Sequence, residues 1–242
     1  MKMLEKIYCK KDEDFVEGLT IVRLNGKCGF IDKTGKEVIP CKYDEAYSFS
    51  EGLARVRLNR KWGCIDKTGR VVIPCKYSFI HEFFEGFAQV LLDGKWGYID
   101  TTGREVIPCK YDWTNDFSAG LAKVELNDKW GYIDTTGREV IPCKYDLVAS
   151  FSEGFARVLF IDKWGFIDKT GREVIPCKYG GINDFKEGLA KVQLNGKIGF
   201  IDKTGKEVIP CIFDGAIYDN KMLYARFNEK YGCVNQLGDI IV

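Results

Sequence analysis

The sequence has no excess of charge, no long apolar run and only one histidine. Its 36 basic residues balance 35 acidic ones, and the net charge of +1 gives no general attraction to nucleic acid or to an anionic membrane. No stretch resembles a signal-peptide core or is long enough to span a bilayer. These absences predict a cytoplasmic protein that binds no nucleic acid and does not insert into membranes.

Catalytic and metal-binding motifs are also missing. The chain contains no G-x-S-x-G, G-x-x-x-x-G-K-[ST], H-E-x-x-H or G-x-G-x-x-G sequence, which are signatures of hydrolases, nucleotide-binding loops and zinc proteases. No two cysteines have C-x-x-C spacing, and His81 alone is too little to complete a series of zinc sites. We therefore expect no enzymatic activity, no catalytic residue, no metal and no cofactor.

Helical periodicity is absent as well. No segment has the 3.6-residue period of an amphipathic helix, whereas many short segments alternate between two faces, as half-buried strands do. In the segment LAKVEL, for example, Ala122, Val124 and Leu126 share one face. The protein is therefore predicted to be all-β.

What the sequence has in abundance is one repeated unit. The phrase KWGYID occurs at residues 95–100 and again at 129–134, with close variants at 61–66, 163–168 and 197–202. Its glycine recurs at intervals of 34, 34, 34, 34, 34 and 33 residues, at Gly29, Gly63, Gly97, Gly131, Gly165, Gly199 and Gly232. Seven copies predict a single repeat domain over residues 1–242, with the repeats at about 16–242.

Each unit is predicted to form a β-meander. A first strand leads through a pair such as Asn-Gly or Asn-Asp into KWGYID, because these residues adopt the positive φ of a two-residue hairpin. A turn with the pattern D-x-T-G follows, and then the strand EVIPCKY. All six prolines occupy one position of this third strand, which predicts an edge strand or a bulge, since proline has no ladder donor. The connection to the next unit leaves room for a very short fourth strand.

Two assemblies of these units fit the sequence. A single unit cannot bury its apolar face alone, so the copies must stack. The N-terminal segment KIYCKKDEDFVEG resembles VIPCKYDEAYSFSEG, and the last copy stops before the proline position. Residues 1–15 are therefore suited to complete the last repeat, which favours a closed, propeller-like ring. The alternative is an open β-superhelix, or solenoid, because 34 residues is short for a propeller blade and the outer copies drift. We expect a monomer.

The phrase KWGYIDTTGREVIPCKYD resembles the repeat of the bacterial WG-repeat (KWG-repeat) family, over about residues 16–242. The match is strongest in copies two to five, and Cys28, Ile198 and Tyr231 replace the tryptophan elsewhere. The resemblance implies a β-repeat protein that acts as a binding or scaffold module. It supplies no functional residues to carry over.

Four repeated positions receive structural interpretations. The tryptophans are expected to pack between neighbouring units rather than to form ligand platforms, and the glycines after them to let another backbone approach closely; the pairs are Trp62 and Gly63, Trp96 and Gly97, Trp130 and Gly131, and Trp164 and Gly165. The cysteines after the prolines are expected to be small buried residues and not disulfides. The aspartate of D-x-T-G is expected to cap its turn rather than to bind calcium.

Function is expected where the repeat symmetry is broken. Irregular segments follow the third strand at 78–84, 112–116, 179–184 and 212–222, and the hairpin at 159–162 also departs from the pattern. Equivalent loops of a repeat protein share one side, so we expect a composite partner-binding surface built from Phe79, His81, Trp113, Asn115 and Asn183. The expected partner is a protein or peptide. A carbohydrate of the cell envelope bound through exposed aromatics, or a purely structural scaffold, is the alternative.

Overall fold

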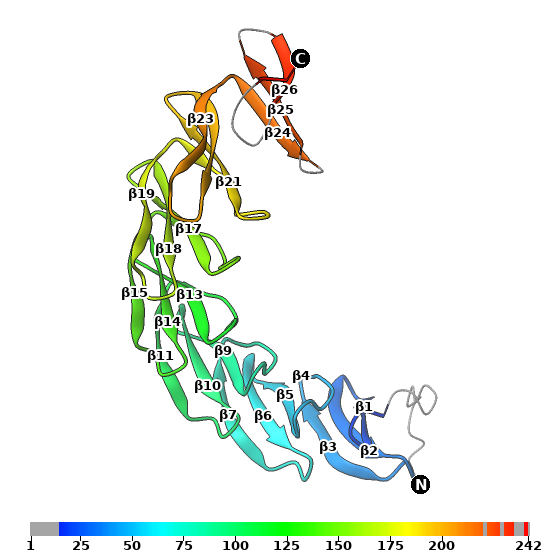
Figure 1. Ribbon diagram of the computed structural model, residues 1–242. Helices are drawn as coiled ribbons and strands as arrows, with labels where there is room; N and C mark the ends of the chain where they lie inside the picture. The colour runs from blue at the N-terminus through cyan, green and yellow to red at the C-terminus, as the bar shows by residue number, and fades with distance from the viewer. Residues whose placement is uncertain (1–14, 220–221, 228–229, 235–239, 242) are drawn as a thin grey trace. The chain divides into compact units, whose positions relative to one another are not determined.

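The computed structural model describes residues 15–219, 222–227, 230–234 and 240–241. Two compact units are distinguished and are described separately: unit 1 is Met1–Leu126 with Asp134–Arg138, and unit 2 is Asn127–Ile133 with Glu139–Val242. All regular structure in the described residues is β-strand, so the prediction of an all-β fold is confirmed (Figure 1). The expectation of a single domain stays a prediction.

In the described part of the chain the strands form seven antiparallel sheets, and each sheet contains only strands that follow one another in the chain. Sheets 1 to 3 consist of β1 (Leu19–Leu24), β2 (Lys27–Asp32) and β3 (Glu37–Tyr43); β4 (Glu45–Ala46), β5 (Leu53–Leu58), β6 (Lys61–Asp66) and β7 (Val71–Tyr77); and β8 (Phe79–Ile80), β9 (Phe87–Leu92), β10 (Lys95–Asp100) and β11 (Glu105–Tyr111).

Sheets 4 and 5 consist of β12 (Trp113–Thr114), β13 (Leu121–Leu126), β14 (Lys129–Asp134) and β15 (Glu139–Tyr145); and β16 (Leu147–Val148), β17 (Phe155–Phe160), β18 (Lys163–Asp168) and β19 (Glu173–Tyr179). Sheets 6 and 7 consist of β20 (Gly181–Ile182), β21 (Leu189–Leu194), β22 (Lys197–Asp202) and β23 (Glu207–Phe213); and β24 (Gly215–Asp219), β25 (Met222–Phe227), β26 (Lys230–Val234) and β27 (Ile240–Ile241).

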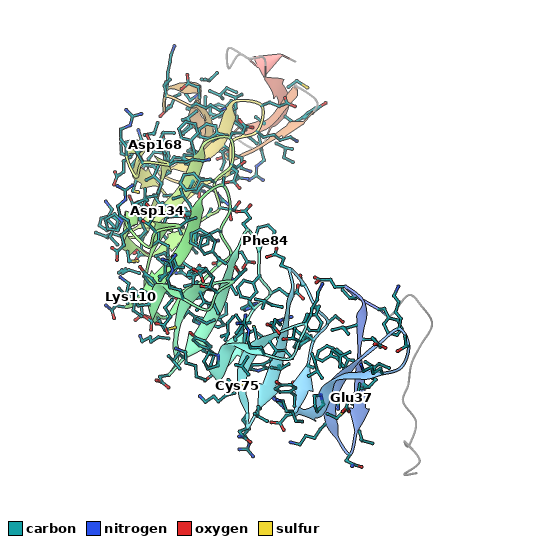
Figure 2. All side chains as sticks on the ribbon, turned by 90° about the horizontal axis from the view of Figure 1, so that it is seen from below. Glu37, Cys75, Phe84, Lys110, Asp134 and Asp168 are labelled. Carbon is teal, nitrogen blue, oxygen red and sulfur yellow. The ribbon has the colours of Figure 1, made fainter. Side chains whose placement is uncertain are left out.

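The short fourth strand exists and changes where one sheet ends and the next begins. In sheets 2 to 6 a two-residue strand from the connection pairs with the following strand, as β8 does with β9. A sheet therefore starts just after the tyrosine that ends the previous EVIPCKY strand. The two edges of the sheets in unit 1 can be followed in Figure 2. Phe84 marks the edge that carries the connecting loops, and Cys75 lies on the edge strand that contains the proline.

The prolines lie on an edge strand and at a bulge, as the sequence predicts. Trp96 of β10 pairs with Tyr111, whereas Tyr98 pairs with Ile107, so three residues of β11 lie opposite Gly97 alone. The bulged backbone passes directly over that glycine: a Cβ at Gly97 would lie 2.5 Å from the carbonyl oxygen of Ile107. The glycine after each tryptophan is therefore required by this close backbone approach.

The aspartate of each D-x-T-G turn caps it. In sheet 3, Asp100 Oδ1 accepts hydrogen bonds from the Thr102 backbone N at 3.0 Å and from Thr102 Oγ1 at 2.6 Å. Gly103 closes the turn with a φ of +84° and donates to the carbonyl oxygen of Asp100. A Cβ at Gly103 would lie 2.9 Å from Ile73 of sheet 2, which places this turn against the preceding sheet. The capping interpretation is confirmed.

The hydrophobic core lies between successive sheets within a unit. Between sheets 2 and 3 it consists of nine buried residues: Trp62, Cys64, Ile73, Tyr77, Ile80, Phe83, Ala88, Val90 and Ile99. Trp62, which is 6% exposed, therefore packs between sheets 2 and 3.

Phenylalanines from several connections also reach back to the sheet before them. The ring pairs are Phe49 with Phe30 at 5.0 Å, Phe117 with Tyr98 at 4.8 Å and Phe185 with Phe166 at 4.5 Å. These three connections are therefore each anchored in the core by a buried phenylalanine.

The closed ring depended on residues 1–15, and residues 1–14 lie outside the described part of the chain. The last sheet is completed by β27, which comes from the C-terminal end of the chain. The open and the closed assemblies of the repeats therefore both stay predictions. The described residues contain no helix with the length and apolarity needed to cross a bilayer.

Candidate functional site

Aromatic rings gather on the loop-bearing edge of sheet 3. Trp96 contacts three other rings: Phe79 at 6.3 Å, His81 at 5.6 Å and Trp113 at 5.7 Å between centroids. Phe79 and His81 are also 4.9 Å apart. Trp113 is 50% exposed and Phe79 37% exposed, so much of this group faces solvent. We call Phe79, His81, Trp96 and Trp113 the aromatic cluster.

Strand register explains why these residues meet. Phe79 of β8 pairs with Leu91 of β9, and Leu91 pairs with Trp96 of β10, so the three side chains form a row on one face of sheet 3. Trp113 begins β12, the edge strand of the next sheet. The ion pair of Lys95 with Asp112, at 2.5 Å, joins the residues that precede Trp96 and Trp113. The edge strand of sheet 4 is thereby held next to the row on sheet 3.

Three of the five residues selected from the sequence thus belong to one cluster, and the other two do not. Asn115 is half-buried, and its backbone carbonyl oxygen accepts a hydrogen bond from the Tyr98 hydroxyl at 2.5 Å. Asn183 is exposed in unit 2, where it lines a cavity of about 540 Å³ together with Phe185, Lys191 and Ile217. Asn115 therefore has a structural contact, and Asn183 belongs to a different site.

Sequence reasoning missed a polar network beneath the cluster. Gln89 and Thr114 are the two buried polar side chains in the part of the chain that the structure describes. Gln89 Oε1 accepts a hydrogen bond from Thr114 Oγ1 at 2.9 Å, and Gln89 Nε2 donates to Asp116 Oδ1 at 2.5 Å. The sequence contained a signal, because the equivalent positions 34 residues earlier are Arg55 and Ile80.

The tryptophans of the repeat differ in whether a basic side chain lies over the indole ring. The guanidinium of Arg57 lies 5.7 Å from the ring of Trp62, and that of Arg157 lies 5.8 Å from Trp164. In sheet 3 the residue at the position of Arg57 is Leu91, and no lysine or arginine among the described residues stacks on Trp96. Trp96 was expected to pack like the others, and it is also a half-buried part of the exposed cluster.

The cysteines of the third strands are free thiols in the described residues and lie against the sheet. Cys109 is half-buried, and its Sγ lies 3.8 Å from the carbonyl oxygen of Val90. Burial raises the pKa of Cys109 and of Cys177 to about 11, so both thiols are protonated at neutral pH. The structural interpretation of this column holds, with partial rather than full burial.

Three exposed apolar residues lie in unit 2, on sheet 5: Leu147, Phe160 and Ile161, of which Ile161 is 72% exposed. Leu147 pairs with Leu159, so it shares a face with Leu159, whereas Phe160 lies on the opposite face. Ile161 occupies the first position of a two-residue hairpin with a φ of +49°, where the equivalent residues are Asn or Asp: Asn25, Asn59, Asp93, Asn127 and Asn195. Its backbone N donates to Asp146 Oδ2 at 2.8 Å. The irregular hairpin singled out in the sequence is therefore a conformational exception as well.

Comparison with known proteins identifies the repeat. A family model described as "WG containing repeat" matches six consecutive segments, at residues 29–62, 62–96, 96–130, 130–163, 164–197 and 198–231. A search of curated proteins found no match.

Solved structures give only distant likenesses. The extracellular domain of the putative one component system BT4673 from B. thetaiotaomicron is 10% identical with a TM-score of 0.31, covering 92% of this chain, which spans 40% of that one. Hsv2 of Kluyvelomyces marxianus is 10% identical with a TM-score of 0.38, covering 79% of this chain and 71% of its own. A eukaryotic initiation factor is 10% identical with a TM-score of 0.39, covering 92% and 72%. These scores are too low to support an argument about fold or function.

Proposed function

Because the chain belongs to the WG-containing repeat family, we propose that it is a non-enzymatic repeat module that binds a protein or peptide partner on the aromatic cluster of unit 1. The observation that carries the proposal is the contact of Trp96 with Phe79, His81 and Trp113, at an edge where Phe79 and Trp113 remain exposed. A few residues dominate the binding energy of protein interfaces, and tryptophan is among the residue types enriched in that group.

The free energy gained by burying the exposed part of Trp113 is large enough to support recognition of a partner. Trp113 is 50% exposed, and covering the exposed half of an indole removes on the order of 100 Å² of apolar surface from water. At about 25 cal/mol per Å² this contributes about 2.5 kcal/mol, which is the size of an interface hot spot. The ring contacts within the cluster also limit the motion of these side chains before binding, so less conformational entropy is lost on association.

The repeats provide a constant frame with a variable edge. The position of Trp113 is occupied by Glu45, Phe79, Leu147 and Gly181 in other repeats, whereas the glycine of KWGYID and the residues of the D-x-T-G turn hardly change. In a repeat protein such variation alters specificity without altering the fold. Four aromatic rings meet at one junction, which supports a single dominant binding surface within unit 1.

The proposal is tested by affinity capture with three forms of the full-length chain. The native bait is compared with Phe79→Ala/Trp113→Ala and with Leu147→Ala, which removes the exposed residue equivalent to Trp113 in unit 2. A partner protein should be retained by the native and Leu147→Ala baits and lost with the double variant, and the purified partner should bind directly. Equal retention by all three baits would place the surface elsewhere.

A carbohydrate ligand is the other outcome that this experiment must distinguish. Exposed indoles also stack on sugars, and Trp113 has an accessible ring. The same three proteins are therefore applied to a glycan array. A glycan signal that Trp113→Ala abolishes, with no protein retained in the capture, would replace the protein partner by a carbohydrate.

A further inference from the structure

At one position of the repeat, three basic side chains reach from one sheet to the next. This position is the third residue of the strand that follows each two-residue strand: Arg55, Gln89, Lys123, Arg157 and Lys191. We call it the junction position. Arg55 donates to the carbonyl oxygen of Ile80 at 3.0 Å, Arg157 to that of Ile182 at 3.1 Å and Lys191 to that of Ala216 at 3.3 Å. The same backbone acceptor of the next sheet is used each time.

The two arginines also bind an acidic residue of the next sheet. Arg55 pairs with Glu82 at 3.1 Å, and Arg157 pairs with Asp184 at 2.6 Å. The Arg55 side chain is only 14% exposed, so its guanidinium is largely enclosed at the junction. A planar guanidinium fits such a position because it donates several hydrogen bonds in one plane while its faces stack on rings.

In sheet 2 the guanidinium does stack on an aromatic pair. The guanidinium carbon of Arg55 lies 4.2 Å from the ring centroid of Tyr47, and Tyr47 lies 5.5 Å from Trp62. At this junction the chain itself therefore supplies all four groups: a cation, an aromatic ring that stacks on it, the tryptophan of the repeat and an acidic residue. Cation–π contacts of this kind are stronger when the cation is shielded from water.

At the junction of sheets 3 and 4 the chain supplies every part of this arrangement except the cation. His81 takes the position of Tyr47 and lies 5.6 Å from Trp96, and Asp116 takes the position of Glu82. The junction residue is Gln89, a shorter and neutral side chain whose amide ends at Asp116. No lysine or arginine in the described part of the chain forms an ion pair with Asp116.

We propose that this junction binds an arginine side chain of the partner, which stacks on His81 beside Trp96 and Trp113 and pairs with Asp116. The inference rests on the proposed function and specifies the partner's chemistry. Charge complementarity supports a cation, because Asp116 is exposed and its hydrogen-bond partner Gln89 is neutral. Arginine is preferred over lysine because Arg55 and Arg157 fill the equivalent positions with a guanidinium that bonds an acid and a carbonyl together.

The test uses the full chain and two short peptides. Acetyl-Gly-Arg-Gly-amide is titrated while the indole N–H resonances of the five tryptophans are followed by NMR, and the citrulline peptide serves as its neutral isostere. One cation–π contact with one partly exposed ion pair predicts a Kd on the order of 10 mM. Saturable shifts are expected at Trp96 and Trp113, with at least fivefold weaker binding of the citrulline peptide.

Two variants locate the binding. Gln89→Arg supplies the junction with the chain's own guanidinium, as Arg55 does in sheet 2, and should abolish the shifts; Asp116→Asn should weaken binding at least fivefold. Arg55→Gln gives an independent check, because it should create a new arginine-dependent shift at Trp62. Absence of shifts with the native chain, equal binding of the citrulline peptide, or unchanged binding by a folded Gln89→Arg variant would each overturn the inference.

The two proposals fail in different ways. If the arginine peptide does not bind but capture of a partner still depends on Phe79 and Trp113, the binding surface stands and the arginine assignment is wrong. If the peptide binds at the junction but the double variant captures as well as the native chain, the surface that recruits the partner lies elsewhere.

Discussion

At the scale of single residues, the fold depends on positions where the backbone allows few side chains. Gly97 lies under the bulged third strand, and Asp100 caps its turn with bonds to Thr102. Ile161 is the opposite case, since a β-branched residue occupies a left-handed conformation that suits Asn or Gly. Each of these positions leads to a quantitative expectation.

Replacing Gly97 by Ala should destabilise the protein by about 3 kcal/mol, because the new Cβ would lie 2.5 Å from a backbone oxygen that only movement of the bulge can displace. Gly94→Ala is the control: its φ is +80°, but nothing lies within 4 Å of the added carbon, so a cost of about 1 kcal/mol is expected. Urea denaturation compares the two. Equal losses would show that conformational strain, and not the close approach, explains the glycine.

Replacing Ile161 by Asn should stabilise the protein by about 1 kcal/mol. Asn adopts positive φ with little strain, and Ile161 is 72% exposed, so few contacts are lost. Thermal unfolding measures the change, with Asn127→Ile, the reverse substitution one repeat earlier, as the matched variant of opposite sign. A decrease in Tm for Ile161→Asn would mean that the isoleucine makes a stabilising contact.

The turn aspartates should make stability depend on acid pH. Hydrogen bonds from Thr68, followed by those from Arg70, lower the pKa of Asp66 to about 2, from an ordinary value of about 3.9. A lowered pKa in the folded state stabilises it above pH 4, and this contribution is lost as the pH falls from about 4 to about 2.

The measurement is Tm between pH 7 and pH 2 for the native chain and for Asp66→Asn, which cannot ionise at this position. The variant should be less stable at pH 7 and should lose less on acidification. Curves that stay parallel down to pH 2 would contradict a role for the Asp66 carboxylate.

At the scale of elements, the connections hold neighbouring sheets together. Phe117 follows the two-residue strand of sheet 4 and contacts Tyr98 at 4.8 Å and Phe87 at 5.3 Å, both on sheet 3. In a repeat array stability is the sum of terms within each repeat and terms between neighbours. The phenylalanines of the connections are a large part of the second kind.

Phe117→Ala should therefore cost about 3 to 4 kcal/mol, as for other buried phenylalanines. Phe84→Ala is the matched control, because Phe84 is 54% exposed and should change stability by less than about 0.5 kcal/mol. Hydrogen exchange of the β9 and β10 amides follows the local effect. Comparable exchange in both variants would argue that sheets 3 and 4 are joined by other contacts.

The elements were predictable from the sequence because their signals are local and repeated. Turn pairs, the position of the prolines and two-residue alternation specified three strands of each unit, and the structure confirms them. The contacts between sheets were not predictable, because no local pattern states which ring of one sheet meets which ring of the next. The convergence of Phe79, His81 and Trp113 on Trp96 is such a contact.

The buried polar network of Gln89 and Thr114 could have been predicted in part from the sequence. Gln89 interrupts a position otherwise filled by Arg or Lys in sheets 2 and 4 to 6, and Thr114 interrupts one filled by Ile or Val in sheets 3, 5 and 6. Those two departures mark the junction in the sequence, although they were missed, and the burial of both side chains depends on packing that the sequence does not encode locally. Departures that coincide in one repeat are therefore the signal to look for.

At the scale of the whole molecule, the repeats are closely similar, and the aromatic cluster is a place where the chain departs from the repeat pattern. Six segments match the WG-containing repeat, and the aromatic cluster with its buried polar network lies at a single junction of unit 1. Unit 2 has an exposed apolar surface residue of its own at Leu147, the position equivalent to Trp113, and this second surface serves as the internal comparison. The account predicts that recognition depends on the first surface and not on the second.

The most direct measurement is a calorimetric titration of the captured partner into the native chain, Trp113→Ala and Leu147→Ala. Loss of about 2.5 kcal/mol of apolar burial predicts a Kd at least tenfold higher for Trp113→Ala, with Leu147→Ala within about twofold of the native chain. A native Kd for Trp113→Ala, or a larger effect of Leu147→Ala, would contradict the assignment of the aromatic cluster as the binding surface.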